Sequence, residues 1–174
     1  MQENQELAPK EALSENASRY IEKRELEGEV TPVKLYEGKR VEIKPGEGTK
    51  IIITEDLNGC TATAILTKDK DSKRSVQMVH FPPFMLNRHL NKIDSMATTE
   101  DRAAENKAAL VYTSEKRQEN KEAIEDHLKK TFGEKIVVVH KTYSERTNDP
   151  ENGILAVEIK DEEIPHFYLG KERL

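Results

Sequence analysis

The stretch "TATAILTKDKDSKRSVQMVHF" (residues 61–81) decides the fold that we expect for this 174-residue chain. Two runs rich in β-branched residues, 61–67 and 75–81, flank a charged segment, and two prolines end the second run. This pattern predicts two strands joined by a solvated turn. If the hairpin is symmetric about Lys70, then Cys60 faces His80, because residues opposed in an antiparallel pair share one face of the sheet.

That register predicts two faces of different character. One face carries Cys60 and His80 together with apolar residues only, namely Ala62, Ala64, Val76 and Met78. The other face carries Thr61, Thr63, Ile65, Ser75, Gln77 and Val79. We therefore expect the first face to be buried, with Cys60 and His80 side by side at the end away from the turn. The register matters, because a slip of one residue would separate the pair.

The rest of the chain supplies further strands and helices. Short runs with strand character cover residues 32–38, 40–48, 50–57, 135–143, 153–160 and the tail 164–174. Residues 6–28 predict a helix with Pro9 in its first turn and Gly28 at its stop. Residues 98–132 predict one helix or two, in which Ser114 caps the second and Ile124, Leu128 and Phe132 recur at every fourth position. This order predicts an α+β fold with a mixed or layered, sandwich-like sheet core flanked by helices.

Length and charge limit the class of protein. We expect a single domain over residues 9–174 after a loose N-terminus, residues 1–8. Charged residues make up 35% of the chain but the net charge is only −5, and aromatics are 5% without tryptophan, which argues against nucleic-acid binding. No apolar run approaches the roughly 20 residues of a membrane span. The polar N-terminus lacks the features of a signal peptide. We expect a cytoplasmic protein, or one delivered into a host cytosol by a dedicated apparatus.

Cys60 is the only cysteine, so the chain forms no internal disulfide and no cysteine-rich metal site. His89, His127, His140 and His166 lack metal-ligand spacing, and we expect neither a metal nor another cofactor. Cys60 is either a small buried apolar residue or a nucleophile with His80 as its base. An ion pair with a protonated His80, or a place at a helix N-terminus if residues 59–66 are helical, would lower the thiol pKa below about 8.5.

The segment around Cys60 resembles a family of cysteine enzymes. Thr54-x-x-Leu57-x-Gly59-Cys60, followed by His80-Phe81 and two prolines, is similar to the "LxGC" glutamine deamidases. This family includes the catalytic domain of cytotoxic necrotizing factor, the Burkholderia lethal factor and the CheD-like chemoreceptor deamidases. The similarity covers about residues 51–83. The interval between cysteine and histidine is slightly longer here, and the later glycine-rich segment of the chemoreceptor branch is absent from the sequence.

The resemblance implies a hydrolase that converts a glutamine of a partner protein to glutamate through a thioester. Cys60 would be the nucleophile, His80 the acid and base, and Thr54 the residue that orients His80. Backbone N–H groups of Gly59 and Cys60 would hold the oxyanion. A bacterial toxin or effector that acts in virulence as a monomer fits this implication.

Two other functions stay open. A non-enzymatic adaptor would use the helical block 98–132, dense in Glu, Lys and Asn, as its binding surface and keep Cys60 as a structural residue. A cysteine protease or transglutaminase would use the same nucleophile with another acyl acceptor.

Overall fold

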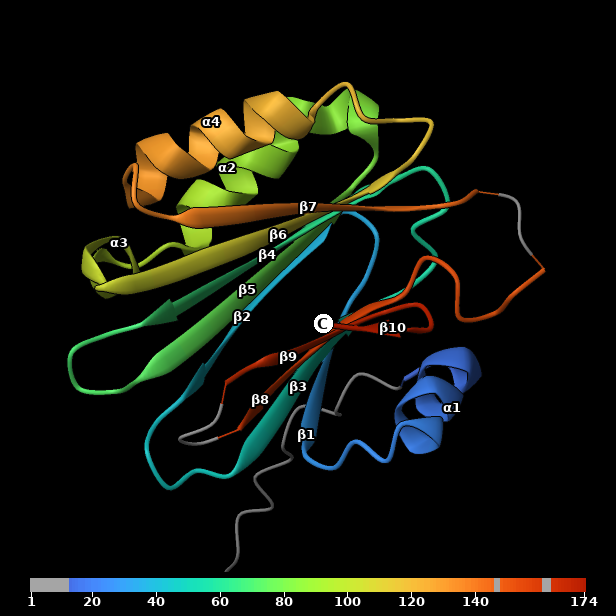
Figure 1. Cartoon of the computed structure of the whole chain (residues 1–174), viewed down its shortest axis with the longest axis horizontal. Coiled ribbons are helices and arrows are strands. Elements are labelled where there is room, and N and C mark those ends of the chain that lie inside the picture. The colour runs from blue at the N-terminus through green and yellow to red at the C-terminus, as the bar shows by residue number, and fades with distance from the viewer. Residues whose placement is uncertain (1–12, 146–147, 161–163) are drawn as a thin grey trace, which may run out of the picture.

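The computed structural model describes residues 13–145, 148–160 and 164–174. Within these described residues, ten strands form two mixed sheets of five strands each, stacked face to face (Figure 1). The first sheet, in spatial order, consists of β1 (Glu29–Val33), β3 (Thr49–Thr54), β8 (Leu155–Lys160), β9 (His166–Leu169) and β10 (Glu172–Arg173). The second consists of β2 (Glu37–Ile43), β5 (Arg74–Phe81), β4 (Thr61–Lys68), β6 (Asn106–Ser114) and β7 (Val137–Tyr143). The predicted α+β class and layered sheet core are confirmed.

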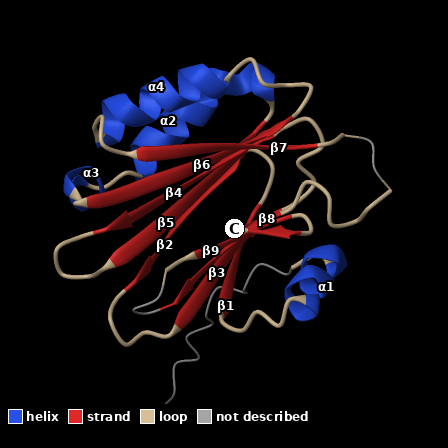
Figure 2. Ribbon diagram, viewed as in Figure 1, coloured by secondary structure: helices blue, strands red, loops and turns tan. Residues whose placement is uncertain are grey.

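Helices cover the two outer faces of this sandwich (Figure 2). Helices α2 (Leu86–Met96) and α4 (Lys121–Phe132) lie on the second sheet, α3 (Thr99–Ala103) lies at its end, and α1 (Glu15–Lys23) lies beside the first sheet. A short 3-10 turn, η1 (Pro83–Met85), leads from β5 into α2. Helix α2 is not among the elements predicted from the sequence, although Leu86, Leu90 and Ile93 have helical spacing and contribute to the cluster under it.

Three apolar clusters hold these layers together. The first fills the space between the sheets and includes Ile52, Val157, Ala64 and Met78. The second lies between the second sheet and helices α2 and α4, and the third between the first sheet and α1. Strands β4 and β5 are therefore buried on both faces, as strands covered on both sides must be.

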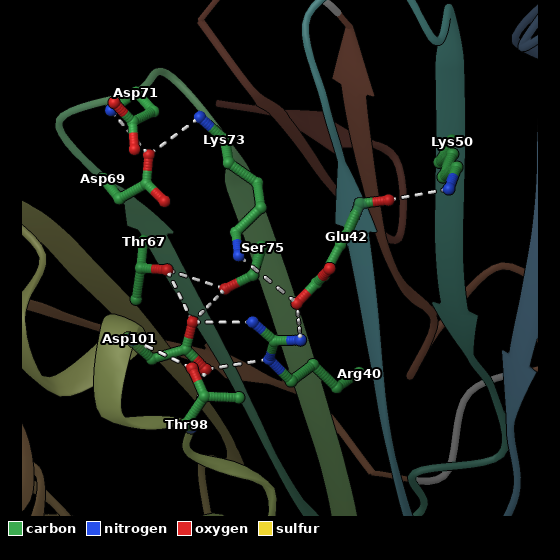
Figure 3. Close-up of polar contacts among 10 residues, drawn as sticks. All are labelled: Arg40, Glu42, Lys50, Thr67, Asp69, Asp71, Lys73, Ser75, Thr98 and Asp101. Carbon is green, nitrogen blue, oxygen red and sulfur yellow. Dashed lines mark hydrogen bonds and ion pairs between the residues drawn. The ribbon is translucent and has the colours of Figure 1, made fainter.

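The hairpin from residue 61 to residue 81 forms with a register that differs from the prediction by two residues. His80 pairs with Ala62, not with Cys60, and Lys68 pairs with Arg74 across the turn. The turn is centred on Asp71 because Asp69 organises it: its carboxylate accepts the N–H groups of Asp71 at 2.9 Å and of Lys73 at 3.0 Å (Figure 3). A shift of two residues preserves the alternation, so the predicted buried face with Ala62, Ala64, Val76 and Met78 is confirmed.

Two predictions about helices are wrong. The block 98–132 is not helical throughout, because residues 106–114 form β6, which pairs with β4 and β7. Its β-favouring core, residues 110–113, lies beside the otherwise open edge of β4, and this pairing outweighs the helix propensity of the flanking Lys and Ala residues. Ser114 ends β6 and does not cap α4, which begins at Lys121. The predicted burial of Ile124, Leu128 and Phe132 along α4 is confirmed.

The first helix is shorter than expected. Ser14 is its N-cap, since its hydroxyl accepts the Ala17 N–H at 3.0 Å. The helix runs from Glu15 to Lys23, so the predicted stop at Gly28 is wrong. The part of the predicted helix in residues 6–12 lies outside the described residues. The predicted loose segment 1–8 lies outside the described residues.

A buried ion pair ties α3 to the second sheet (Figure 3). Arg40 on β2 donates from Nε and Nη2 to the two carboxylate oxygens of Asp101, both at 2.8 Å. Ser75 and Thr67 donate to the same carboxylate at 2.9 and 3.1 Å. The Thr98 N–H donates to it at 3.1 Å as part of a capping box. Every oxygen of this buried carboxylate is satisfied, which marks the cluster as a structural anchor.

Candidate active site at one end of the sandwich

The three residues singled out from the sequence lie at one end of the sandwich. Thr54 ends β3 in the first sheet, and His80 lies near the end of β5 in the second. The loop 55–60 carries the chain from the first sheet to the second and brings Cys60 to the start of β4. All three positions therefore lie where β3 and β5 end and β4 begins.

Thr54 and His80 are in direct contact across the two sheets. The Thr54 hydroxyl lies 2.7 Å from His80 Nδ1 and 2.7 Å from the Val33 carbonyl oxygen. A hydroxyl has one hydrogen and a carbonyl oxygen has none. The hydrogen bond between Thr54 and the Val33 carbonyl must therefore use the hydroxyl hydrogen. Thr54 therefore donates to Val33 and accepts from His80, which places the ring proton on Nδ1. His80 Nε2 then carries a free lone pair, the form that a general base needs.

His80 is 1% exposed and its surroundings keep it neutral. Burial lowers the pKa of His80 to about 4, because a charged imidazolium would lose its hydration. Within the described residues, Nε2 is buried and has no hydrogen-bond partner. A buried acceptor without a donor is uncommon in folded proteins and often marks a position that receives a ligand.

Cys60 lies at the same end of the sandwich as His80 and packs between the two sheets. Because His80 pairs with Ala62, Cys60 is diagonal to His80 in the register, but it lies just before β4 and outside the paired residues. The side chain is half-buried and packs against the inter-sheet cluster. The described residues contain no hydrogen bond between Cys60 and His80 Nε2. The predicted direct opposition of 60 and 80 is thus wrong, although both residues lie at one end of the sandwich.

The charge state of the pair also differs from the expected ion pair. Burial raises the pKa of the Cys60 thiol, where a partnership with a protonated histidine would lower it. Cys60 is not at a helix N-terminus either, since β4 follows it directly. Burial therefore favours the neutral form of both groups, and any activation of the thiol by His80 would need proton transfer from Cys60 to the imidazole.

A tyrosine that the sequence does not single out holds the backbone at Cys60. The hydroxyl of Tyr143, at the end of β7, accepts from the Gly59 N–H at 2.8 Å and donates to the Cys60 carbonyl at 2.6 Å. The Cys60 N–H donates to the Leu57 carbonyl within the same turn. Both N–H groups predicted to bind an oxyanion are therefore engaged inside the protein, and that role would need these bonds to open.

Gly59 is required at this turn for two reasons. Its φ of +98° suits glycine, and a Cβ at this position would approach the carboxylate of Glu145 to 3.3 Å. Glu145 is held there by the Ser114 hydroxyl at 2.6 Å. Tyr143, Glu145 and Ser114 come from strands β6 and β7 and the segment after β7. No local signal near Cys60 predicts their presence, because only the tertiary pairing brings them to the turn.

The other histidines are dispersed and have partners of their own. His89 Nε2 lies 2.8 Å from the Thr63 hydroxyl, His127 Nε2 lies 2.8 Å from Asp94, and His140 Nε2 lies 3.2 Å from Glu125. Across residues 13–145, 148–160 and 164–174, no three His, Cys, Asp or Glu side chains gather as a metal site. In the same ranges no helix is both long and apolar enough to cross a membrane. No protein-family model matches the chain, and no curated protein matches it either.

Proposed function

We propose that the protein is a cysteine hydrolase that deamidates a glutamine side chain of a partner protein to glutamate. The observation that carries this proposal is the Val33–Thr54–His80 chain, with 2.7 Å at each step, because it fixes the tautomer that leaves Nε2 free as a base. The half-buried Cys60 at the same end of the sandwich supports it. The choice of glutamine as substrate rests on the resemblance to the LxGC deamidases.

The reaction follows from the neutral state of the pair. His80 Nε2 takes the thiol proton as Cys60 Sγ attacks the carboxamide carbon, and the resulting imidazolium is stabilised by its Nδ1–H bond to Thr54. His80 then returns the proton to the departing nitrogen, the C–N bond breaks, and ammonia leaves behind a thioester. Water, deprotonated by His80, attacks the thioester and releases glutamate and the thiol. The thiol must approach Nε2 for the first step, and catalytic hydrogen bonds of this kind often tighten only in the complex.

The adaptor alternative relies on a continuous helical surface over residues 98–132. The continuous helical surface over 98–132 does not exist, because its centre is strand β6 inside the second sheet. A transglutaminase would form the same thioester and pass it to an amine, whereas a protease would form its thioester from a backbone peptide bond. We propose the glutamine side chain as the group attacked and water as the acceptor. The resemblance implies either a bacterial effector that enters a host cytosol or a bacterial cytoplasmic enzyme.

The test is glutamine conversion in a host-cell extract and in a library of glutamine peptides, read by mass spectrometry as glutamate at former glutamine positions. Wild type should convert specific glutamines, Cys60→Ala should convert none, and His80→Gln should be slower by roughly 10²-fold or more. His166→Gln is the matched control, because His166 lies on β9 and contacts Arg173 instead of the site. Conversion that is equal in wild type and Cys60→Ala would refute the proposal.

A further inference from the structure

A pocket of about 380 Å³ opens beside His80 at the site end of the first sheet. It lies between the N-terminal end of α1, the segment that joins β1 to β2, and the loop that follows β3. Its walls are largely apolar and include Leu13, Ala17, Pro32 and Leu35. Its polar lining consists of His80, Glu55, Asp56, Lys34 and Ser14. A pocket with apolar walls and a few convergent polar groups is the usual form of a small-ligand site.

The pocket presents two acceptors that nothing in the described residues satisfies. His80 Nε2 and Glu55 Oε2 are both buried and have no hydrogen-bond partner there. The Thr54 contact makes Nε2 an acceptor, and a carboxylate oxygen is an acceptor as well. Burying two acceptors without donors is unfavourable, so a ligand that brings N–H or O–H groups to this point would gain affinity from both.

We infer that this pocket binds a primary carboxamide on an aliphatic stem, with the amide N–H groups donating to Glu55 Oε2 and His80 Nε2 in the resting complex. The N–H on Nε2 must leave before that nitrogen can take the thiol proton, because a neutral imidazole has one lone pair. The apolar walls suit the methylene stem, and the two acceptors suit the two hydrogens of an –NH₂ group. The inference rests on the proposed function and deepens it: it places the leaving nitrogen of the substrate beside the proton carried by His80. It also makes Glu55 a specificity-determining residue.

Glu55 also accounts for discrimination between substrate and product. The carboxylate that deamidation creates has no N–H donors and would meet Glu55 with a like charge. Glu55 therefore favours the amide over the acid, against the opposite charge of Lys34 in the same lining. Glu122 is an exposed carboxylate on α4, outside the pocket lining, and supplies a matched comparison.

The experiment measures binding in the Cys60→Ala protein, where a bound amide is not consumed. The probes are pentanamide, pentylamine and pentanoate, and the readout is the ¹⁵N NMR signal of the His80 ring nitrogens. Pentanamide should shift the Nε2 signal in a saturable manner, and pentanoate should not. Adding Glu55→Met should weaken pentanamide roughly tenfold or more, since a hydrogen bond to a charged acceptor is lost. Glu122→Met, the same substitution at an exposed position of α4 outside the pocket, should leave the affinity unchanged.

Several results would overturn the inference. The first two are a His80 signal that does not respond to pentanamide and equal affinities in Glu55→Met and Glu122→Met. The others are pentanoate binding as tight as pentanamide and tighter binding of pentylamine, which would make the site one for cations. Glu55→Gln retains an acceptor oxygen and should keep more affinity than Glu55→Met. Pentanamide binding without any Cys60-dependent glutamine conversion would refute the proposed function alone. Conversion that is insensitive to Glu55→Met would refute the inference alone.

Discussion

At the residue scale, the chemistry of the site depends on one threonine hydroxyl. Thr54 has a single hydrogen, and the Val33 carbonyl takes it, so the bond to His80 has only one possible direction. This determines the tautomer of a histidine whose ring hydrogens would otherwise be ambiguous. The resemblance implies that Thr54 orients His80. The structure adds a physical reason, because the hydrogen bond between them can run only from His80 Nδ1–H to the Thr54 hydroxyl.

Replacing Thr54 tests this polarity directly. Thr54→Val keeps the shape of the side chain but leaves His80 Nδ1–H without its acceptor and the Val33 carbonyl without its donor. We expect an unfolding free energy lower by about 1–3 kcal/mol and an imidazole that populates both tautomers in ¹⁵N NMR spectra. Thr54→Ser retains the hydroxyl and should keep the Nδ1–H tautomer. A single Nδ1–H tautomer in Thr54→Val would contradict the assignment.

The buried His80 also predicts a pH dependence of stability. Its pKa is about 4 in the folded protein and about 6.5 in an unfolded chain. Between these pH values the unfolded chain binds the additional proton. The free energy of unfolding therefore rises as the pH increases from about 4 to about 6.5, and it decreases again as the pH falls through this range. Full protonation of His80 alone would remove about 3 kcal/mol.

Chemical denaturation across this pH range measures the effect, with His80→Gln compared against wild type. The variant should have a shallower slope between pH 4 and 6.5. Buried His89, whose pKa is lowered to about 3, contributes a slope of the same sign that both proteins share. Identical slopes in the two proteins would mean that His80 titrates normally.

At the element scale, the turn between β4 and β5 explains why the predicted buried face is correct and the predicted register is wrong. Alternation along the strands is a property of the sequence itself, so the buried face could be read from residues 61–81. The register depends on how Asp69 folds the five residues of the turn, and their composition alone does not determine the centre. A two-residue error leaves the faces unchanged but moves Cys60 from a direct to a diagonal position.

The clamp from β7 to the Cys60 turn gives a second prediction at this scale. Tyr143→Phe removes the hydroxyl that joins the Gly59 N–H and the Cys60 carbonyl. We expect an unfolding free energy lower by about 1–3 kcal/mol and a faster hydrogen exchange of the Gly59 amide, because that N–H loses its acceptor. Tyr112→Phe is the control, since its ring packs against Tyr143 at a centroid distance of 5.1 Å. Unchanged Gly59 exchange in Tyr143→Phe would show that the clamp is absent in solution.

At the scale of the whole molecule, the layered architecture followed from element order, but the contents of the second sheet did not. Residues 106–114 contain enough helix-favouring residues to suggest continuity with their neighbours, and only the partner strand β4 makes them a strand. The residues of the candidate site could likewise be predicted only in part from the sequence. Thr54, Cys60 and His80 lie within one sequence window, whereas Tyr143 and Glu145 arrive from the other end of the chain. Glu55 is within the window, but its unpaired oxygen becomes visible only once the pocket is formed.

The anchor between Arg40 and Asp101 should matter for the whole fold. Asp101→Asn would leave the partly buried Arg40 guanidinium with Glu42 as its remaining charged partner and weaken four side-chain contacts at once. We expect an unfolding free energy lower by about 1–3 kcal/mol. Glu100→Gln, an exposed neighbour on the same helix, should change it by less than about 1 kcal/mol. Equal effects of the two substitutions in denaturant unfolding would contradict a structural role for the pair.

The most direct test of the central claim, that His80 activates Cys60, is the rate of Cys60 alkylation by iodoacetamide across pH in wild type and His80→Gln. The account predicts that wild type already reacts once the pH exceeds about 4, where His80 becomes neutral and can accept the thiol proton. His80→Gln should react only as the pH approaches the raised pKa of the isolated thiol. Superimposable profiles for the two proteins would show that Cys60 is a buried apolar residue uncoupled from His80.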